Sequence, residues 1–197
     1  MSATSSTSTR TAEQQRSLPV GATLWLTGLP SAGKSTIARA LADRLRAEGR
    51  RVQVLDGDEV RPHLSAGLGF TRADRDTNVA RIGWVAQLLA RHGVTVLVPV
   101  IAPYADARQA VRQAHAEAQV PFAEVFVATS LAVAESRDVK GLYAKARQGE
   151  ISGMTGVDDP YEEPRSAELV LDTAEVDLAT SVELVSALLT AIREDQP

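Results

Sequence analysis

Nine consecutive residues near the N-terminus have the types and spacing of a phosphate-binding loop. They are Gly28, Leu29, Pro30, Ser31, Ala32, Gly33, Lys34, Ser35 and Thr36, which form a complete GxxxxGK[ST] motif. Glycines let backbone N–H groups approach phosphate oxygens, and the helix that follows adds the positive end of its dipole. Lys34 is expected to reach the β- and γ-phosphates of ATP, and the Ser35 hydroxyl is expected to bind Mg²⁺. The motif predicts nucleotide binding and phosphoryl transfer.

Two carboxylates, Asp56 and Asp58, follow the next β-like segment. Their place predicts that they project from the carboxyl end of a sheet beside the phosphate loop, where open α/β sheets bind ligands. One can orient Mg²⁺ through water while the other accepts the proton of an attacking hydroxyl, and the spacing leaves open which does which. A solvated Asp-Gly turn is the alternative. No acidic residue ends the apolar segment 94–100, so the usual Walker-B aspartate is missing there, which favours a catalytic role for Asp56 or Asp58.

Arginines and an aromatic residue come next in the chain. Arg75 and Asn78 are three residues apart, so on a helix they share a face that can grip an anion. Phe70 lies in a glycine-flanked loop, which makes it a candidate for stacking on a base. A solvated, charged helix face is the alternative for the arginines, which include Arg61.

Apolar segments with strand-like and helix-like periods alternate from Thr23 onward, which is typical of a parallel sheet covered on both faces. The predicted strands are 23–27, 52–55, 94–100, 122–127 and 169–171, and the predicted helices are 34–48, 72–92, 106–118, 130–137 and 178–193. A glycine-rich, charged segment at about 140–164 interrupts this pattern and is expected to act as a lid. The residues expected in the core of the second helix are Trp84, Val85, Leu88 and Leu89.

Composition limits the class of protein. The chain has 197 residues, 44% of them hydrophobic, a net charge of −4 and no cysteine. These values predict a single α/β domain at 21–197 and argue against nucleic-acid partners, disulfides and thiolate metal sites. No apolar run is long enough to span a membrane, so a soluble, cytoplasmic protein is expected. The Ser/Thr-rich residues 1–20 are expected to be a disordered tail, with an organellar transit peptide as the alternative.

Five segments together resemble the adenylylsulfate kinase family. They are LTGLPSAGKST, VLDGDEVR, LGFTRADRDTNVARIGWVAQLLARHG, RDVKGLYAKAR and GEISGMTGVDDPYEEP, and the likeness runs from about Ala22 to Ile192. The resemblance implies a kinase that uses ATP and Mg²⁺ to phosphorylate the 3′-hydroxyl of adenosine 5′-phosphosulfate (APS). It also implies a three-layer α/β/α P-loop fold with a five-stranded parallel sheet in strand order 2-3-1-4-5. A homodimer is implied too, and coupling to a sulfurylase that makes APS is expected to need a separate partner.

The same resemblance implies a role for individual residues. Asp56 and Asp58 would form the acidic pair and act with Lys34 in catalysis. Phe70 would stack on the adenine of APS, and Arg75 with Asn78 would grip its phosphosulfate. The implied substrate-binding set is Asp58, Arg61, Phe70, Arg75, Asn78, Ile101, Ala102, Lys140, Leu142, Gly153 and Met154.

Three positions depart from the family pattern. Ala102 stands where the family commonly has a serine proposed to carry a phosphoryl group, so transfer here is expected to be direct. Ala105 replaces an arginine, and Arg108, one helical turn on, is a candidate replacement as an anion contact. Met154 replaces a stacking phenylalanine and is expected to hold the acceptor more weakly. These departures keep two alternatives open: a related small-molecule kinase with another acceptor, and a non-catalytic nucleotide-binding module.

Overall fold

Five parallel strands form the central sheet of the computed structural model, which describes residues 20–194. The strands are β1 (Ala22–Thr27), β2 (Val52–Val54), β3 (Thr95–Pro99), β4 (Phe122–Val127) and β5 (Leu169–Leu171). Their order is β2-β3-β1-β4-β5, with every pair parallel, so the predicted sheet and its strand order are confirmed. The disordered tail expected for residues 1–20 lies, apart from Val20, outside the described residues.

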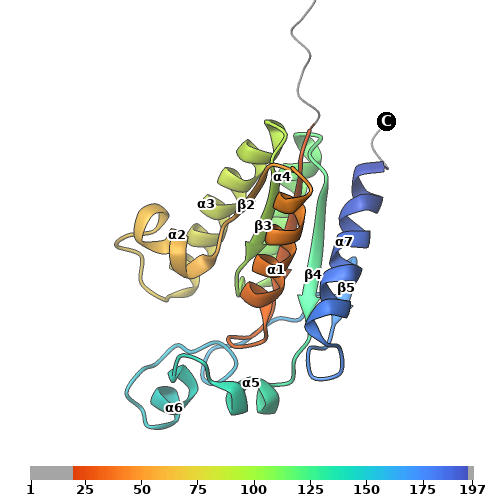
Figure 1. Cartoon of the computed structure of the whole chain (residues 1–197). Helices are drawn as coiled ribbons and strands as arrows, with labels where there is room; N and C mark the ends of the chain where they lie inside the picture. Colours follow the sequence, from red (N-terminus) through yellow and green to blue (C-terminus); the bar gives the residue numbers. More distant parts are fainter. Residues whose placement is uncertain (1–19, 195–197) are drawn as a thin grey trace, which may run out of the picture.

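Helices cover both faces of the sheet, as Figure 1 shows. They are α1 (Lys34–Ala47), α2 (Gly57–Leu64), α3 (Arg72–Arg91), α4 (Ala105–Glu117), α5 (Leu131–Arg137), α6 (Leu142–Arg147) and α7 (Leu178–Glu194). The five predicted helices agree with the structure to within one residue at each end, whereas α2 and α6 were not predicted. No helix within residues 20–194 combines the length and the apolar composition that crossing a membrane requires.

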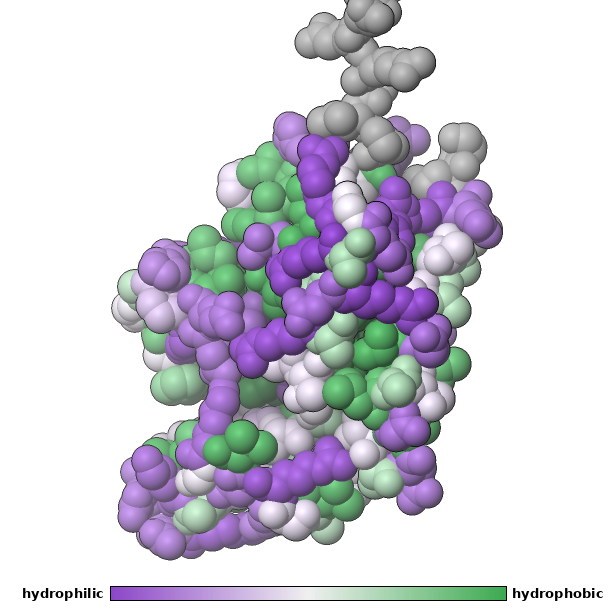
Figure 2. Space-filling model, viewed as in Figure 1, coloured by the Kyte–Doolittle hydropathy of each residue, from purple (hydrophilic) through white to green (hydrophobic). Residues whose placement is uncertain are grey.

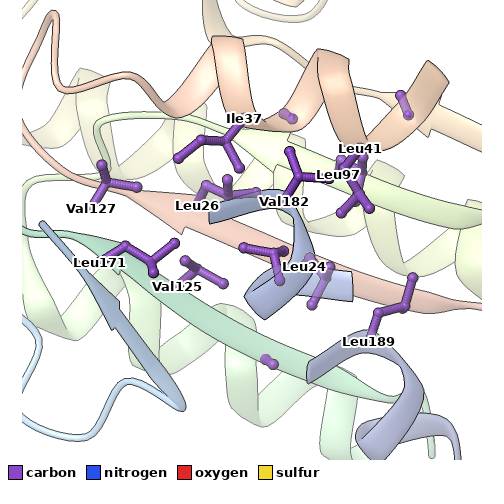
Figure 3. Close-up of a cluster of buried hydrophobic side chains, with 14 of the residues drawn as sticks. Leu24, Leu26, Ile37, Leu41, Leu97, Val125, Val127, Leu171, Val182 and Leu189 are labelled. Carbon is purple, nitrogen blue, oxygen red and sulfur yellow. The ribbon is translucent and has the colours of Figure 1, made fainter. Parts of the chain in front are cut away.

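Strand β1 divides the core into two layers because alternate side chains of a strand point to opposite faces. Leu24 and Leu26 pack against α1 and α7 in the cluster drawn in Figure 3. Trp25 points the other way and packs among residues of α3 and β3. All six residues of β1 are buried, so the phosphate-binding loop at its end is attached to a strand packed on both faces.

The outer face of α3 differs from the sequence prediction. Trp84 is 63% exposed and Leu88 is 40% exposed, so neither belongs to the core, whereas Val85 and Leu89 pack partly against it. The sheet-facing residues of α3 include Ile82 and Ala86. Two residues along a helix correspond to a rotation of about 200°, so Trp84 lies opposite Ile82. An apolar stripe therefore faces outward on α3.

Buried His115 predicts a pH dependence of stability. Its ring nitrogens lie 2.8 Å from the Val111 carbonyl oxygen and 3.1 Å from the Thr23 hydroxyl, and burial lowers its pKa below the ordinary 6.5. Below pH 6.5 the unfolded chain binds a proton at this histidine that the folded chain does not bind. The free energy of unfolding should therefore decrease as the pH is lowered, by up to about 1.4 kcal/mol per pH unit. The contribution should be complete above pH 6.5.

Urea unfolding between pH 5 and 8 measures this effect. His115→Gln should flatten the acidic side of the stability profile, and His92→Gln, at an exposed histidine, should leave it as in the wild type. An unchanged acidic slope in His115→Gln would show that other groups cause the acid sensitivity.

Candidate active site

The phosphate-binding loop leaves the carboxyl end of β1 and turns directly into α1 (Figure 1). Gly28 and Gly33 have φ angles of 150° and 102°, values that other residues rarely adopt. A Cβ atom on Gly28 would lie 2.5 Å from the Val127 carbonyl oxygen, so this glycine is also required by the neighbouring strand. The loop thus has the strand–turn–helix setting that the motif requires.

Lys34 lies inside this loop. Its ammonium group donates hydrogen bonds to the carbonyl oxygens of Gly28 at 2.9 Å and Leu29 at 2.6 Å. Burial lowers the pKa of Lys34 to about 7, while the charges of Asp56 and Asp58 act in the opposite direction. The lysine is therefore close enough to both carboxylates to be influenced by them, and a phosphate group beside it would favour its charged form.

Residues after β4 and β5 brace the same loop, and the sequence did not predict them. The Thr173 hydroxyl donates to the Ala32 carbonyl oxygen at 2.8 Å, and the Thr129 hydroxyl donates to the same oxygen at 3.2 Å. Arg137 donates to the Thr173 hydroxyl and carbonyl, both at 2.8 Å. The sequence gives one indication of Thr129 and Thr173: each follows a strand by two residues, which places it at the edge of the sheet where α/β proteins bind ligands.

The two aspartates have different environments. Asp56 is 3% exposed and caps α2: one carboxylate oxygen accepts the Asp58 N–H at 3.1 Å, and the other lies 3.1 Å from the Arg39 guanidinium. The Asp58 side chain is 72% exposed and forms an ion pair with Lys140 of the lid. Asp56 is therefore held in place from α1, whereas Asp58 is exposed and its only ion-pair partner within residues 20–194 is Lys140. Arg39 was not predicted, and its signal was its place one turn after Ser35 on the loop's own helix.

Two arginines lie near the ring of Phe70, in the loop before α3. Its ring is 60% exposed, and the guanidinium carbons of Arg61 and Arg75 lie 4.5 Å and 5.7 Å from the ring centre. Arg61 also donates to the carbonyl oxygens of Leu68 and Gly69, which holds the glycine-flanked loop against α2. An exposed ring held by its own loop can still offer one face to a flat ligand.

Arg75 connects α3 to the lid. It donates to the Thr155 hydroxyl at 2.9 Å, to the Gly153 carbonyl oxygen and to the Phe70 carbonyl oxygen at 2.9 Å. Asn78, one turn along α3, accepts a hydrogen bond from the Ser65 hydroxyl at 2.5 Å. The predicted pair therefore does lie on one side of α3, with Arg75 at the lid and Asn78 at the end of α2.

The segment 140–164, the predicted lid, contains α6 and shares a small hydrophobic cluster with α5 and the phosphate-binding loop. Met154 is 6% exposed and packs with Ala134 and Tyr143, with Leu142 and Leu29 at the edge of the cluster. The Tyr143 hydroxyl donates to the Pro30 carbonyl oxygen at 3.1 Å, which ties the lid to the phosphate-binding loop. The covering of an adenine by Met154 stays a prediction, because its side chain packs within the lid. Figure 2 shows a hollow between the surface over α2 and α3 and the lid.

The loop after β3 carries Ile101 and Ala102. The Thr27 hydroxyl donates to the Ile101 carbonyl oxygen at 2.5 Å, and Ala102 is buried with φ 44°. Arg108 is only 4% exposed, its guanidinium pairs with Glu124 at 2.8 Å, and it also donates to the Ala102 carbonyl oxygen. The suggestion that Arg108 replaces a missing anion contact is therefore wrong, because a buried carboxylate already pairs with its charge.

The donors near the loop are suited to magnesium. Asp56, Asp58 and Ser35 offer oxygen ligands, and within residues 20–194 no group of three histidine, cysteine or carboxylate side chains is arranged around one point. Mg²⁺ prefers oxygen ligands and commonly uses one or two protein groups together with substrate phosphates. The residues present fit such an ion.

Comparisons with known proteins agree with this geometry. A family model described as "Adenylylsulphate kinase" matches residues 20–172. A "Probable adenylyl-sulfate kinase" from Synechocystis is 56% identical over 162 residues, which cover 82% of this chain and 89% of the relative. The APS kinase CysC of Mycobacterium tuberculosis, solved with AMPPNP and APS, has a TM-score of 0.83 at 45% identity, covering 86% of this chain and 98% of that one. A hexameric APS kinase from Thiobacillus denitrificans has a TM-score of 0.65 at 39% identity, covering 88% and 29%.

Proposed function

We propose that Lys34, Asp56 and Asp58 carry out the phosphoryl transfer of this protein. The chain belongs to the adenylylsulphate kinase family, and it is therefore an ATP-dependent kinase that transfers the γ-phosphoryl group of ATP to the 3′-hydroxyl of APS. The product is 3′-phosphoadenosine 5′-phosphosulfate. The observation that supports different roles for the two aspartates is their contrast in exposure. Asp56 is buried and held by Arg39, whereas Asp58 is exposed and pairs with Lys140.

Asp58 is the general base in this proposal. Its exposed carboxylate accepts the proton of the 3′-hydroxyl while that oxygen forms a bond to the γ-phosphorus and the bond from phosphorus to the β-phosphate oxygen breaks. ADP leaves, and the product carries the phosphoryl group. Lys34 stabilises the negative charge on the β- and γ-phosphates during transfer.

Asp56 and Ser35 would position the Mg²⁺ ion. The Ser35 hydroxyl would hold Mg²⁺, and Asp56, fixed by its hydrogen bonds, would orient the ion through water. When bound, the ion supplies positive charge that neutralises the phosphates. The rigid position of Asp56 supports this division because an orienting group gains from losing its freedom to move.

The acceptor binds between α2, α3 and the lid. Arg75 supports the proposal because it lies on α3 and its guanidinium donates both to Phe70, in the loop before α3, and to Thr155 of the lid, so an anion beside it would lie near both parts. Closure of the lid would exclude water, which limits hydrolysis of ATP. Lys140, the first residue of the lid, which we call its front, forms an ion pair with Asp58 and would therefore also lie near the acceptor.

Direct transfer can be tested by rapid-quench kinetics with ATP labelled in the γ-phosphate. Ala102 has no hydroxyl, so we expect the label to pass to 3′-phosphorylated APS, identified by mass, with none retained on the protein. Label that stays on the acid-quenched protein would show an intermediate elsewhere. Release of ADP without any APS-dependent product would favour a kinase with another acceptor, and ATP binding without turnover would favour a non-catalytic module.

Phe70→Ala should weaken APS binding by about 5-fold, since an aromatic stacking contact is worth about 1 kcal/mol. The KM for ATP should remain unchanged. Steady-state kinetics with varied APS measures the effect, and Leu184→Ala, at an exposed leucine of α7, is the control. An unaltered KM for APS in Phe70→Ala would limit this ring to supporting its own loop.

We further propose that two copies of the chain associate through α3. Trp84, Leu88 and Ala80 are exposed on one stripe, and Ala80 and Leu88 are equally distant from Trp84. In a two-fold antiparallel arrangement about Trp84, the large Leu88 of one copy would meet the small Ala80 of the other, so the surface complements itself. A cytoplasmic location, supported by the absence of cysteine, and a separate sulfurylase partner remain predictions.

The replacement of both Trp84 and Leu88 by serine is expected to convert a dimer into a monomer at micromolar concentration. Sedimentation velocity measures this change, and Leu184→Ser should leave the dimer intact. A doubly substituted protein that still sediments as a dimer would place the interface elsewhere.

A further inference from the structure

Arg108, in the first turn of α4, connects three separate parts of the chain. Its Nη1 donates to the Ala102 carbonyl oxygen at 2.7 Å and its Nη2 donates to the Glu162 carbonyl oxygen at 2.6 Å. Its Nε lies 2.8 Å from a carboxylate oxygen of Glu124 in β4, as an ion pair without the alignment of a hydrogen bond. The guanidinium therefore joins the loop after β3, the end of the lid and the sheet.

Glu124 is itself held in position. It is 7% exposed, and its second carboxylate oxygen lies 3.5 Å from Arg112. Glu168 accepts from Arg112 and from the Glu124 backbone N–H, which completes the network. The buried charge of Arg108 is thus compensated by a carboxylate that cannot easily move, and this fixes the direction of the two hydrogen bonds that Arg108 donates.

The loop that Arg108 holds has an unfavourable backbone. Ala102 has φ 44°, a left-handed conformation that is unfavourable for a residue with a Cβ atom. Such a conformation persists when its surroundings impose it, and the bond from Arg108 to the Ala102 carbonyl is one such restraint. This loop carries two of the residues that the family resemblance places at the acceptor.

The end of the lid is attached to the same loop. The Glu162 N–H donates to the Pro103 carbonyl oxygen at 2.8 Å, and the Glu162 carboxylate accepts the Ala105 N–H at 2.7 Å. The Tyr104 hydroxyl donates to Asp159 at 2.9 Å. With Arg108, these bonds join residues 101–105 and 159–162 into one unit, which we call the seam.

We infer that Arg108 is a positioning residue for the acceptor: it holds the seam so that the loop after β3 and the end of the lid face APS in a fixed relative position. The inference rests on the proposed acceptor site between α2, α3 and the lid. It requires the forked guanidinium, because Arg108 reaches its three partners from three different nitrogens, whereas the donors of a lysine are all on one nitrogen.

The first test compares Arg108→Met with Arg108→Met/Glu124→Gln. The single variant leaves the buried carboxylate unpaired and should be destabilised, whereas the double variant removes both charges and should recover most of the wild-type melting temperature. In the double variant the KM for APS is expected to rise at least about 10-fold, with the KM for ATP changed less than about 2-fold. A folded double variant with the wild-type KM for APS would overturn the inference.

Two further variants keep the test decisive. Arg108→Lys keeps the positive charge beside Glu124 and should still raise the KM for APS several-fold, because the fork is lost. Arg112→Met is the matched control, since Arg112 belongs to the same network and contacts neither side of the seam. An equal rise in this control would show that the network acts only on stability. Absence of APS-dependent transfer in the wild type would instead contradict the function itself.

Discussion

Replacement of Asp58 by asparagine is expected to lower kcat by at least about 10²-fold, because the amide cannot accept the proton of the attacking hydroxyl. The side chain keeps its size, so the KM for ATP should change little. The pair with Lys140 would lose its charge, but both groups are more than half exposed, so little stability should be lost with it. A coupled assay of ADP release at saturating ATP and APS measures kcat.

Glu59→Gln is the matched control for this substitution. Glu59 follows Asp58 in α2, its side chain is 63% exposed, and it pairs with Arg39 rather than with the lid. Its kcat should stay within about 2-fold of the wild type. If Asp58→Asn turned over as fast as Glu59→Gln, the assignment of Asp58 as the base would be wrong, and Asp56 would be the remaining candidate.

Replacement of Lys34 by methionine is expected to reduce kcat by about 10³-fold, since the loss of one preorganised donor to a transition state costs about 10²- to 10³-fold and here a full charge is lost as well. Methionine is similar in length and apolar, so it can occupy the buried position between the Gly28 and Leu29 carbonyls. The melting temperature is expected to remain within a few degrees of the wild type, because removing a desolvated charge offsets part of the cost of leaving these two carbonyl oxygens without a donor.

Binding and turnover must be separated in this experiment. Single-turnover kinetics at saturating ATP gives the chemical step, and titration with a fluorescent ATP analogue gives the affinity. Lys145→Met, at an exposed lysine of α6, should leave both unchanged. If Lys34→Met lost affinity but kept the wild-type single-turnover rate, Lys34 would serve to bind ATP and would have no part in the chemical step.

The features that the sequence predicted well are local. The phosphate-binding loop is contiguous, and its function depends on the elements next to it, which are a short apolar strand and a helix with a clear helical period. The buried strands are short apolar runs, and the order of the strands came from the family resemblance. Helix α2 escaped prediction because it has eight residues with Pro62 inside, and α6 because six residues between glycines give little periodicity.

The features that escaped prediction depend on contacts between distant residues. Arg108 and Glu124 are 16 positions apart on different elements, and only the packing of α4 against β4 brings them together. Thr129 and Thr173 meet at Ala32 for the same reason, since two strands end at one edge of the sheet. A large apolar residue such as Trp84 is expected in the core, but the orientation of α3 about its own axis decides which residues face the sheet, and it turns Trp84 toward solvent.

The two ends of the lid are fastened by different physical means. At the front, Lys140 and Asp58 are 54% and 72% exposed, so dissolved ions screen their attraction. Next to the seam, the side chains of Arg108 and Glu124 are only 4% and 9% exposed and are shielded from those ions. A rise in ionic strength should therefore weaken the contact between Lys140 and Asp58 and leave the contacts of the seam in place. Substrate entry in this kinase would then respond to the salt content of its surroundings, while the attachment of residues 159–162 to the loop after β3 would not.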